Sequence, residues 1–202
     1  MQLHKFAATA GANIVKAAAG INRFAELERV LATFCISIPA LLIWFDHGQI
    51  LPSISAYYSM CEHEIFYFPL TVASMLFIVN GLIKNKHIYN TILGTMLAGV
   101  ILFNCDDFTL VHALFAVAFF GGNGIVILVF SSKKDLWFKA VLVIVICMAI
   151  LGWIAFQWYS LFWAEWVSFA IIALHYVLES AGVIDVQTKI NGPTVTHQHQ
   201  LE

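Results

Sequence analysis

A polar segment rich in hydroxyl groups stands directly before a long apolar run of the chain. Its sequence, LPSISAYYS at residues 51–59, is followed by Glu62, His63 and Glu64. Histidine and carboxylate side chains are ligands that zinc and other divalent ions take in proteins. A bound divalent ion lowers the pKa of a water to about 7 and makes it a nucleophile. The segment therefore holds residue types that metal-assisted hydrolysis needs.

A second polar segment, CDDFTLVH at residues 105–112, adds two aspartates and a histidine. The two segments together predict a site for zinc or another divalent cation. Its expected ligands are Glu62, His63, Glu64, Asp106, Asp107 and His112. The expected catalytic residues are Ser55, Asp107 and His112, and the expected ligand-binding residues beside them are Ser53, Tyr57, Tyr58 and Glu165. The alternative is structural, with solvated carboxylates and with histidines that cap helix ends.

His175 and Glu179 support a separate hypothesis, because they lie inside an apolar run. The sequence ALHYVLESAG places them four residues apart, on one face of a helix. Ionisable groups inside a membrane are costly and suggest a functional site. At about 1.5 Å per residue, His175 lies about 15 Å from Glu165, too far to join the first cluster. Both residues are predicted to bind a ligand, and the alternative is a hydrogen bond that only fixes helix packing.

The expected partners of this pair are each other or three asparagine amides, Asn80, Asn104 and Asn123. Glu179 has a further structural alternative, since its side chain could snorkel to the membrane interface.

The composition places the chain among integral membrane proteins. Of its 202 residues, 61% are hydrophobic and only 11% are charged, whereas soluble domains carry about 25% charge. A soluble fold of this size has too little interior to hide so much apolar surface. Six stretches approach the length of a membrane span, and in lipid they must be helical. They are residues 30–45, 64–83, 89–105, 110–130, 137–156 and 161–183. The predicted fold is therefore all-α, an integral membrane bundle of six transmembrane helices.

The charges predict the orientation of this bundle. With six spans, all 10 basic residues fall on one side, which the positive-inside rule makes the cytoplasmic side. Both termini are then cytoplasmic, and the chain lies in the inner membrane. The opposite side carries carboxylates, at Asp46, Glu62, Glu64, Asp106, Asp107 and Glu165.

The chain divides into three parts. In residues 1–25, apolar side chains recur at three- and four-residue steps, which predicts an amphipathic helix on the membrane surface. A poorly ordered basic leader is the alternative. Residues 26–186 form the six-helix transmembrane domain, and residues 187–202 are a polar, flexible tail.

Two further patterns concern packing and redox state. The sequence FFGGNG at residues 119–124 predicts a close helix approach or a kink in the fourth span. The four cysteines contain no CxxC pair, so free thiols are expected. A disulfide between Cys61 and Cys105 is the alternative, since both fall at helix boundaries on the same side.

Several segments resemble a group of uncharacterised bacterial multi-pass membrane proteins. These segments are LPSISAYYS, EIFYFPLTVASMLFIVNG, VHALFAVAFF and FWAEWVSFAIIALHYVLESAG. The group has a Ser-Ile-Ser-Ala-Tyr-Tyr loop before its second helix and then a basic–acidic pair, a place that His63–Glu64 takes here. Val111–His112 matches a Val-His helix start, and Trp163–Glu165 matches a Trp-x-Glu on the last helix. The resemblance implies a multi-pass membrane protein and carries no activity.

The chain is also distantly similar to ceramidase, adiponectin-receptor and related transmembrane hydrolases. Those proteins have seven helices and hold zinc through a HxxxH pair on the last one. Here His175 is followed four residues later by Glu179, and one helix is missing.

Two functions follow as expectations. The first is a metal-dependent hydrolase that acts on a lipid or amphipathic substrate at the outer membrane face. The alternative is a non-enzymatic protein that binds or transports a lipid or a small ligand through residues 175–179. Membrane lipids are the expected partners, no nucleic acid is expected, and a homo-oligomer is left open.

Overall fold

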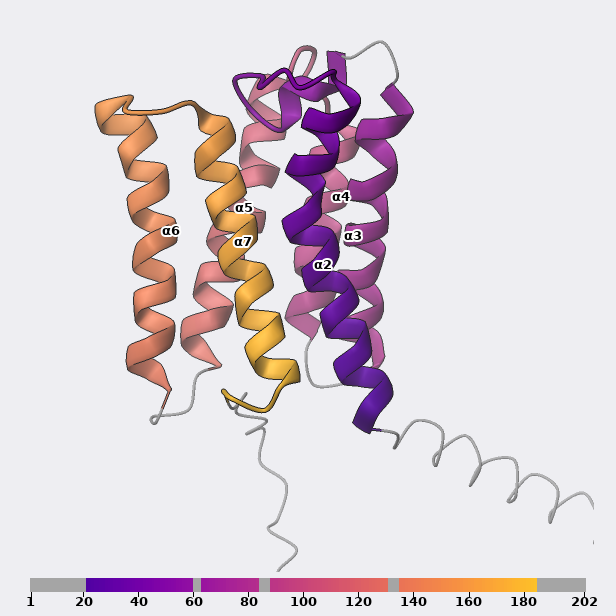
Figure 1. Cartoon of the computed structure of the whole chain (residues 1–202), viewed down its shortest axis with the longest axis vertical. Coiled ribbons are helices and arrows are strands. Elements are labelled where there is room, and N and C mark those ends of the chain that lie inside the picture. The colour runs from indigo at the N-terminus through magenta and orange to yellow at the C-terminus, as the bar shows by residue number, and fades with distance from the viewer. Residues whose placement is uncertain (1–20, 60–62, 84–87, 131–134, 185–202) are drawn as a thin grey trace, which may run out of the picture.

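The computed structural model describes residues 21–59, 63–83, 88–130 and 135–184, and every regular element in these ranges is helical. Six long helices run up and down in chain order, with one short 3-10 helix between the first two (Figure 1). Their bounds are α2 Ile21–Phe45, η1 Ser55–Ser59, α3 His63–Ile83, α4 Ile88–Leu102, α5 Thr109–Val129, α6 Leu136–Phe156 and α7 Leu161–Ser180. We name the end of the bundle at η1 the outer end and the opposite end the inner end.

Five of these helices are long and apolar enough to cross a membrane, and α4 is apolar but has only 15 residues. The all-helical prediction is confirmed for the described residues, and α3, α5, α6 and α7 lie close to their predicted positions. Residues 1–20 lie outside the described residues, so the amphipathic helix stays a prediction. Residues 21–25 form the start of α2.

Two helix boundaries differ from the prediction, each for a local reason. Helix α2 begins at Ile21, well before the predicted residue 30, and the added turns include Glu28, whose side chain is buried in the bundle. Helix α4 ends at Leu102, before the predicted residue 105. There the Asn104 side chain accepts a hydrogen bond from the Asp107 N–H (2.7 Å), and a turn replaces the last helical turn.

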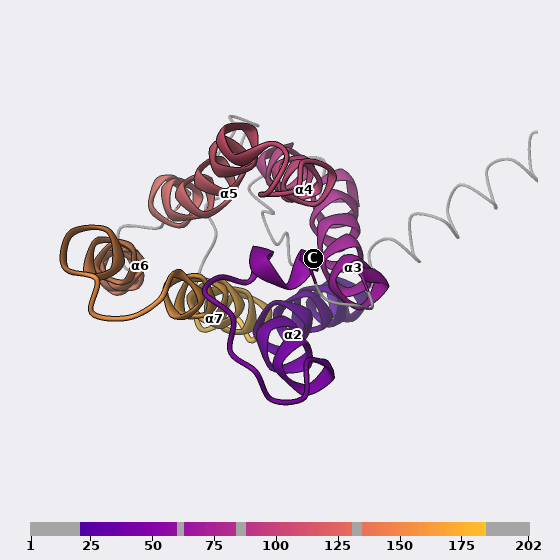
Figure 2. The same ribbon diagram turned by 90° about the horizontal axis from the view of Figure 1, so that it is seen from above.

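The six helices form a closed ring (Figure 2). Each helix packs on its neighbours in the chain, and α2 closes the ring by packing on α7. Helix α6 is outermost and packs on α5 and α7. The short helix η1 lies across the outer end of the ring, where it packs on α3.

Aromatic side chains fill the middle of the ring. Phe77 of α3 meets Phe119 of α5 edge-on with ring centroids 5.4 Å apart, and it meets Tyr176 of α7 at 5.7 Å. Phe169 of α7 packs on Phe119 (5.8 Å) and on Phe120 (5.2 Å). We call these five residues the aromatic layer, because they tie α3, α5 and α7 together across the ring.

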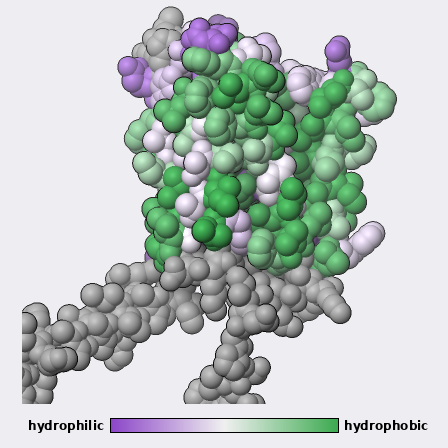
Figure 3. Space-filling model, turned by 180° about the vertical axis from the view of Figure 1, so that it is seen from behind, coloured by the Kyte–Doolittle hydropathy of each residue, from purple (hydrophilic) through white to green (hydrophobic). Residues whose placement is uncertain are grey.

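The face of the bundle that Figure 3 shows is largely apolar along its flank, and hydrophilic residues gather on this face at the outer end. Large apolar side chains such as Leu102, Leu110 and Val117 are mostly exposed. An exposed apolar belt of this extent suits contact with lipid, because a soluble monomer rarely exposes such large patches.

Helices α3 and α4 approach each other most closely at Gly94. The Ser74 hydroxyl of α3 donates to the Gly94 carbonyl oxygen at 2.8 Å. A Cβ at Gly94 would lie 2.7 Å from the Ser74 carbonyl oxygen and 2.9 Å from the Ile78 nitrogen, both backbone atoms that cannot yield. In the predicted glycine segment, a Cβ at Gly122 would lie 2.7 Å from Leu93 Cδ2 of α4, whereas a Cβ at Gly121 would meet nothing within 4 Å. Gly94 differs from Gly122 in that its added Cβ would meet backbone atoms of the neighbouring helix.

We expect Gly94→Ala to destabilise the protein by about 1–3 kcal/mol, because the added methyl forces α3 and α4 apart. Gly121→Ala is the matched control on α5, and its effect should stay below about 1 kcal/mol. Unfolding of the purified protein in micelles measures both. Equal stability of the two variants would contradict the close approach at Gly94.

Candidate functional site

Tyr57 holds the outer loop in shape. Its side chain is fully buried. The Tyr57 hydroxyl donates to the Gln49 carbonyl oxygen at 2.6 Å and accepts from the Leu51 N–H at 3.3 Å. Its ring packs on Phe162 of α7 with centroids 6.0 Å apart. Burial raises the pKa of the Tyr57 hydroxyl, so it stays a neutral donor.

The serines of the loop shape its turn. The Ser53 hydroxyl oxygen accepts from the Ala56 N–H at 3.0 Å, which starts η1. The Ser53 and Ser55 hydroxyl oxygens lie 3.0 Å apart and share a hydrogen bond. Tyr58, the other predicted tyrosine, packs edge-on against Phe66 and Tyr67 of α3. The hydroxyl-rich segment is therefore largely engaged in its own fold.

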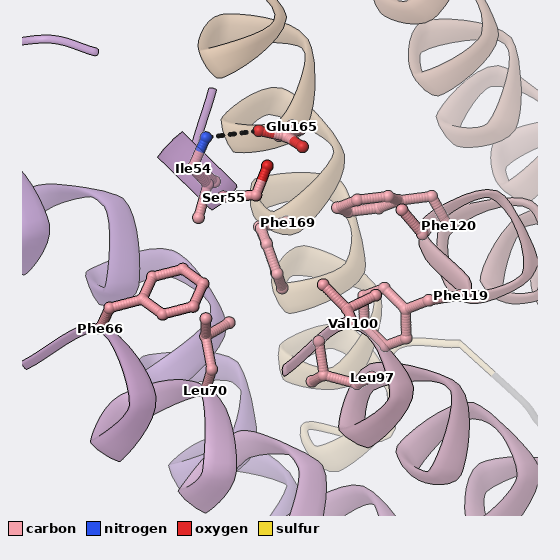
Figure 4. Close-up of a pocket in the computed structure, with 11 residues that line it drawn as sticks. Ile54, Ser55, Phe66, Leu70, Leu97, Val100, Phe119, Phe120, Glu165 and Phe169 are labelled. Carbon is pink, nitrogen blue, oxygen red and sulfur yellow. Dashed lines mark hydrogen bonds between the residues drawn. The ribbon is translucent and has the colours of Figure 1, made fainter. Parts of the chain in front are cut away.

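Two hydrogen bonds dock this loop on the start of α7. The Phe162 N–H donates to the Pro52 carbonyl oxygen at 2.8 Å. That N–H belongs to the first turn of the helix, where no intrahelical acceptor exists. The Ile54 N–H donates to Glu165 Oε2 at 2.6 Å (Figure 4). The loop thus supplies a hydrogen-bond acceptor for an N–H at the start of α7, and Glu165 supplies an acceptor for an N–H of the loop.

Glu165 and Ser55 also border a cavity of about 20 Å³, which is the space of one water. The remaining lining residues are apolar, and Figure 4 shows most of them beneath the two polar groups. They are Ile54, Phe66, Leu70, Leu97, Val100, Ala116, Phe119, Phe120 and Phe169. The structure therefore brings two predicted site residues, Ser55 and Glu165, to one outer cavity.

The residues of the predicted catalytic set, Ser55, Asp107 and His112, form hydrogen bonds with residues outside the set. His112 is buried, and its Nδ1 lies 2.8 Å from the Phe103 carbonyl oxygen. Since a carbonyl only accepts, Nδ1 carries the hydrogen of this bond. Asp107 Oδ2 accepts from the Asn104 amide at 2.8 Å. Ser55 bonds to Ser53, so no hydrogen bond joins Ser55, Asp107 and His112 in the described chain.

Cys105 is a free thiol. Its sulfur lies 3.7 Å from the Ser55 carbonyl oxygen and 3.6 Å from Asp106 Oδ1. Burial, with the Asp106 carboxylate adding to it, raises the pKa of the Cys105 thiol, so it stays protonated and poorly nucleophilic at neutral pH. Cys61 lies outside the described residues.

No group of three His, Cys, Asp or Glu side chains suited to a metal ion occurs in the part of the chain that the structure describes. Two predicted ligands, Glu62 and the His63 side chain, fall outside that part. Glu64 and Asp106 are exposed at the outer end. The predicted metal site therefore stays a prediction.

A second group of polar side chains lies buried or half-buried toward the inner end, and five helices contribute to it. We call it the inner polar cluster: Glu28, Asn80, Tyr89, Asn90, Asn123, His175, Tyr176 and Glu179. The Asn90 amide donates to Asn80 Oδ1 at 2.7 Å, and the Tyr176 hydroxyl donates to Asn90 Oδ1 at 3.0 Å. The Asn123 amide donates to the Phe119 carbonyl oxygen at 2.8 Å.

Both members of the predicted intramembrane pair face this cluster. His175 and Glu179 line one cavity of about 10 Å³ with Tyr89, Asn90 and Tyr176, close to the least volume that holds a water. The cavity confirms that the pair shares a face. Of the expected amide partners, Asn123 also lines the cavity, whereas Asn104 lies in the outer turn.

Glu28 is the residue that sequence reasoning missed. It is only 2% exposed, and its carboxylate lies close enough to Tyr89 and Tyr176 to interact electrostatically with both, as does Glu179. The sequence did contain a signal for it, because Glu28 lies at a helical spacing from the apolar residues of the first span and so shares their face of the helix. The Asn80 amide nitrogen is also buried, and it makes no hydrogen bond in the described chain.

Comparison with known families assigns the chain to a family. Residues 37–180 match a family of unknown function, DUF7103. The chain belongs to this family. The DUF7103 match runs from the middle of α2 to the end of α7 and includes the outer cavity and every member of the inner polar cluster except Glu28.

A search of curated proteins and of solved structures found no match. The predicted resemblance to an uncharacterised family is therefore confirmed in this coarse form. Its motif-level correspondence and the likeness to transmembrane hydrolases gain no support from these comparisons.

We expect Tyr57→Phe to destabilise the protein by about 1–3 kcal/mol, because it leaves the Gln49 carbonyl and the Leu51 N–H without their partner. Ser59→Ala is the control, since the exposed Ser59 hydroxyl donates to the Ala56 carbonyl oxygen within η1. Denaturant unfolding in micelles compares the two. A Tyr57→Phe variant as stable as Ser59→Ala would show that the loop does not depend on this hydroxyl.

The metal prediction has its own test in thermal unfolding. If the outer residues bind a divalent ion, a chelator should lower the midpoint and added zinc should restore it, because a ligand that binds only the folded state stabilises it. Replacement of His63 and His112 together by alanine should abolish both responses. A wild-type midpoint indifferent to chelator and to zinc would refute the site.

Proposed function

We propose that this protein is a six-span inner-membrane protein that passes protons or a small cation through the interior of its bundle. One observation supports this most: two water-sized cavities, each lined by a carboxylate of α7, lie toward opposite ends of the ring. The proposal develops the transport alternative that His175 and Glu179 raise in the sequence.

Chain connectivity supports six spans. Helix α3 ends at the inner end and α5 begins at the outer end, so the connecting α4 has to traverse the bundle. At about 1.5 Å per residue its 15 residues cover about 22 Å, and the flanking residues complete the crossing. The basic side chains that the structure describes, Arg29 and Lys139, lie in the inner halves of α2 and α6, which by the positive-inside rule supports a cytoplasmic inner end with cytoplasmic termini.

Cavity size limits the substrate. Sites for drug-sized ligands measure about 300–1,000 Å³. The inner and outer cavities measure about 10 and 20 Å³. A lipid does not fit inside the bundle, whereas a proton, a water or a bare small cation does.

Charge favours a cationic species. Glu28, which is buried, and Glu179, which is half-buried, both lie near Tyr89 and Tyr176, so two carboxylates share one neighbourhood at the inner end. Like charges in a low-dielectric site disfavour joint ionisation, and a proton, a bound cation or the His175 imidazolium relieves the repulsion. Asparagine and tyrosine oxygens offer further acceptors. Such groups are typical of proton relays in membrane proteins.

The aromatic layer gives the pathway its barrier. Phe119 and Phe169 line the outer cavity, and Tyr176 lines the inner one. Phe77 packs against both Phe119 and Tyr176 and lies between these regions. Passage therefore requires the rings to move, which suits gated transport better than an open pore.

The hydrolase hypothesis has less support. Each residue of its catalytic set is hydrogen-bonded to a different partner, as described above. A hydrolase would need these groups within hydrogen-bonding reach of one another in a substrate complex.

Flux through reconstituted liposomes tests the proposal. We expect wild-type protein to carry protons, Na⁺ or K⁺ down an imposed gradient, as followed with a pH dye or isotope uptake. Glu28→Gln and Glu179→Gln should lower flux to the level of protein-free liposomes, because each removes a titratable carboxylate while keeping its shape.

Glu26→Gln is the matched control, since Glu26 lies two residues before Glu28 on α2 but is exposed. Its flux should equal that of the wild type. No flux of any of the three ions, or flux unaffected by Glu28→Gln and Glu179→Gln, would overturn the proposed function.

A further inference from the structure

A groove of about 540 Å³ lies between α2 and α3 near their outer ends. Its walls are apolar apart from one carboxylate at the start of α3. They consist of Phe34, Leu41, Phe45, Glu64, Ile65, Phe68 and Pro69. Phe45 and Phe68 are 48% and 68% exposed, so the groove opens on the outside of the ring.

The length of the groove matches one leaflet of a bilayer. Along α2 it runs from Phe34 to Phe45, which at about 1.5 Å per residue is about 17 Å. The hydrocarbon core of a bilayer is about 30 Å thick, so one leaflet contributes about half of that. The groove also has the volume of a ligand site, unlike the two cavities inside the bundle.

The mouth of the groove offers hydrogen-bond acceptors. Glu64 is exposed in the first turn of α3, at the level where the apolar flank ends. Pro69 lies within α3 and has no N–H, which deprives the Ile65 carbonyl of its usual helical donor. Ile65 lines the same groove.

Among the described Asp, Glu, Lys and Arg side chains, those at this end of the bundle are acidic. Asp46, Asp106 and Asp107 lie at the same end. The basic side chains that the structure describes, Arg29 and Lys139, belong to the inner halves of α2 and α6. An anionic head group would be repelled there, and an ammonium group would be attracted.

We propose that this groove binds an outer-leaflet phospholipid with a primary-amine head group, such as phosphatidylethanolamine. One acyl chain lies along Phe34, Leu41 and Phe68, and the ammonium group donates hydrogen bonds to the Glu64 carboxylate. A quaternary choline head group has no N–H to donate, and a glycerol head group leaves the lipid anionic. This site does not rest on the transport proposal, since it lies outside the ring.

The test uses the delipidated full chain in micelles, titrated with dioleoyl phosphatidylethanolamine, phosphatidylcholine or phosphatidylglycerol. The readouts are the thermal unfolding midpoint and the lipid retained in native mass spectrometry. We expect phosphatidylethanolamine to raise the midpoint most and to be retained most. Glu64→Gln should remove this advantage and leave the response to phosphatidylcholine unchanged.

Two further variants separate the site from its surroundings. Asp46→Asn removes a charge from the same end without altering the groove lining, and it should keep the preference for phosphatidylethanolamine. Leu41→Trp fills the groove and should lower retention of all three lipids. Equal retention of the three lipids by the wild type, a preference for phosphatidylglycerol, or an undiminished preference in Glu64→Gln would overturn the proposal.

Discussion

Hydrocarbon offers a helix no hydrogen-bonding partner, so polar groups inside a membrane bundle must find partners within the chain or in enclosed water. The described polar side chains mostly follow this constraint. The Ser168 hydroxyl bonds back to the Ala164 carbonyl oxygen at 2.8 Å, and the Ser74 hydroxyl bonds across to α4 at Gly94. Where several helices turn polar groups inward at one depth, the result is the inner polar cluster. Within this cluster the described residues leave the constraint incompletely met, because the buried Asn80 amide nitrogen has no hydrogen-bond partner among them.

Sequence reasoning predicts the helices well where apolar runs end at turns, and poorly where polar residues face inward. Helices α3, α5 and α6 begin within one residue of their predicted positions because uncharged runs end at clear polar connections. Helix α2 was predicted too short because a charge pattern cannot distinguish a buried glutamate from a solvated one. The Glu28 side chain belongs to the interior, and that assignment depends on α4 and α7, which the local sequence does not contain.

The candidate site shows a similar division. The sequence indicates that His175 and Glu179 share a face, since a four-residue spacing is a local property. The meeting of Ser55 with Glu165 depends on how the ring closes, and no local pattern encodes it. The outer acids and histidines look like one cluster because they share an end of the bundle. Within the described chain, Asp107 and His112 are each held by their own neighbours, at Asn104 and Phe103.

The docking of the first loop on the last helix has a consequence for biosynthesis. Ile54 and its acceptor Glu165 are 111 residues apart in the chain. A ribosome adding about 5–20 residues per second needs about 6–22 s to make that stretch. During this interval four complete helices enter the membrane beside a loop whose Ile54 N–H and Pro52 carbonyl oxygen do not yet have their partners on α7. The ring therefore cannot close until α7 has been synthesised, and a chain that stops before α7 leaves the face of α2 that packs on α7 uncovered.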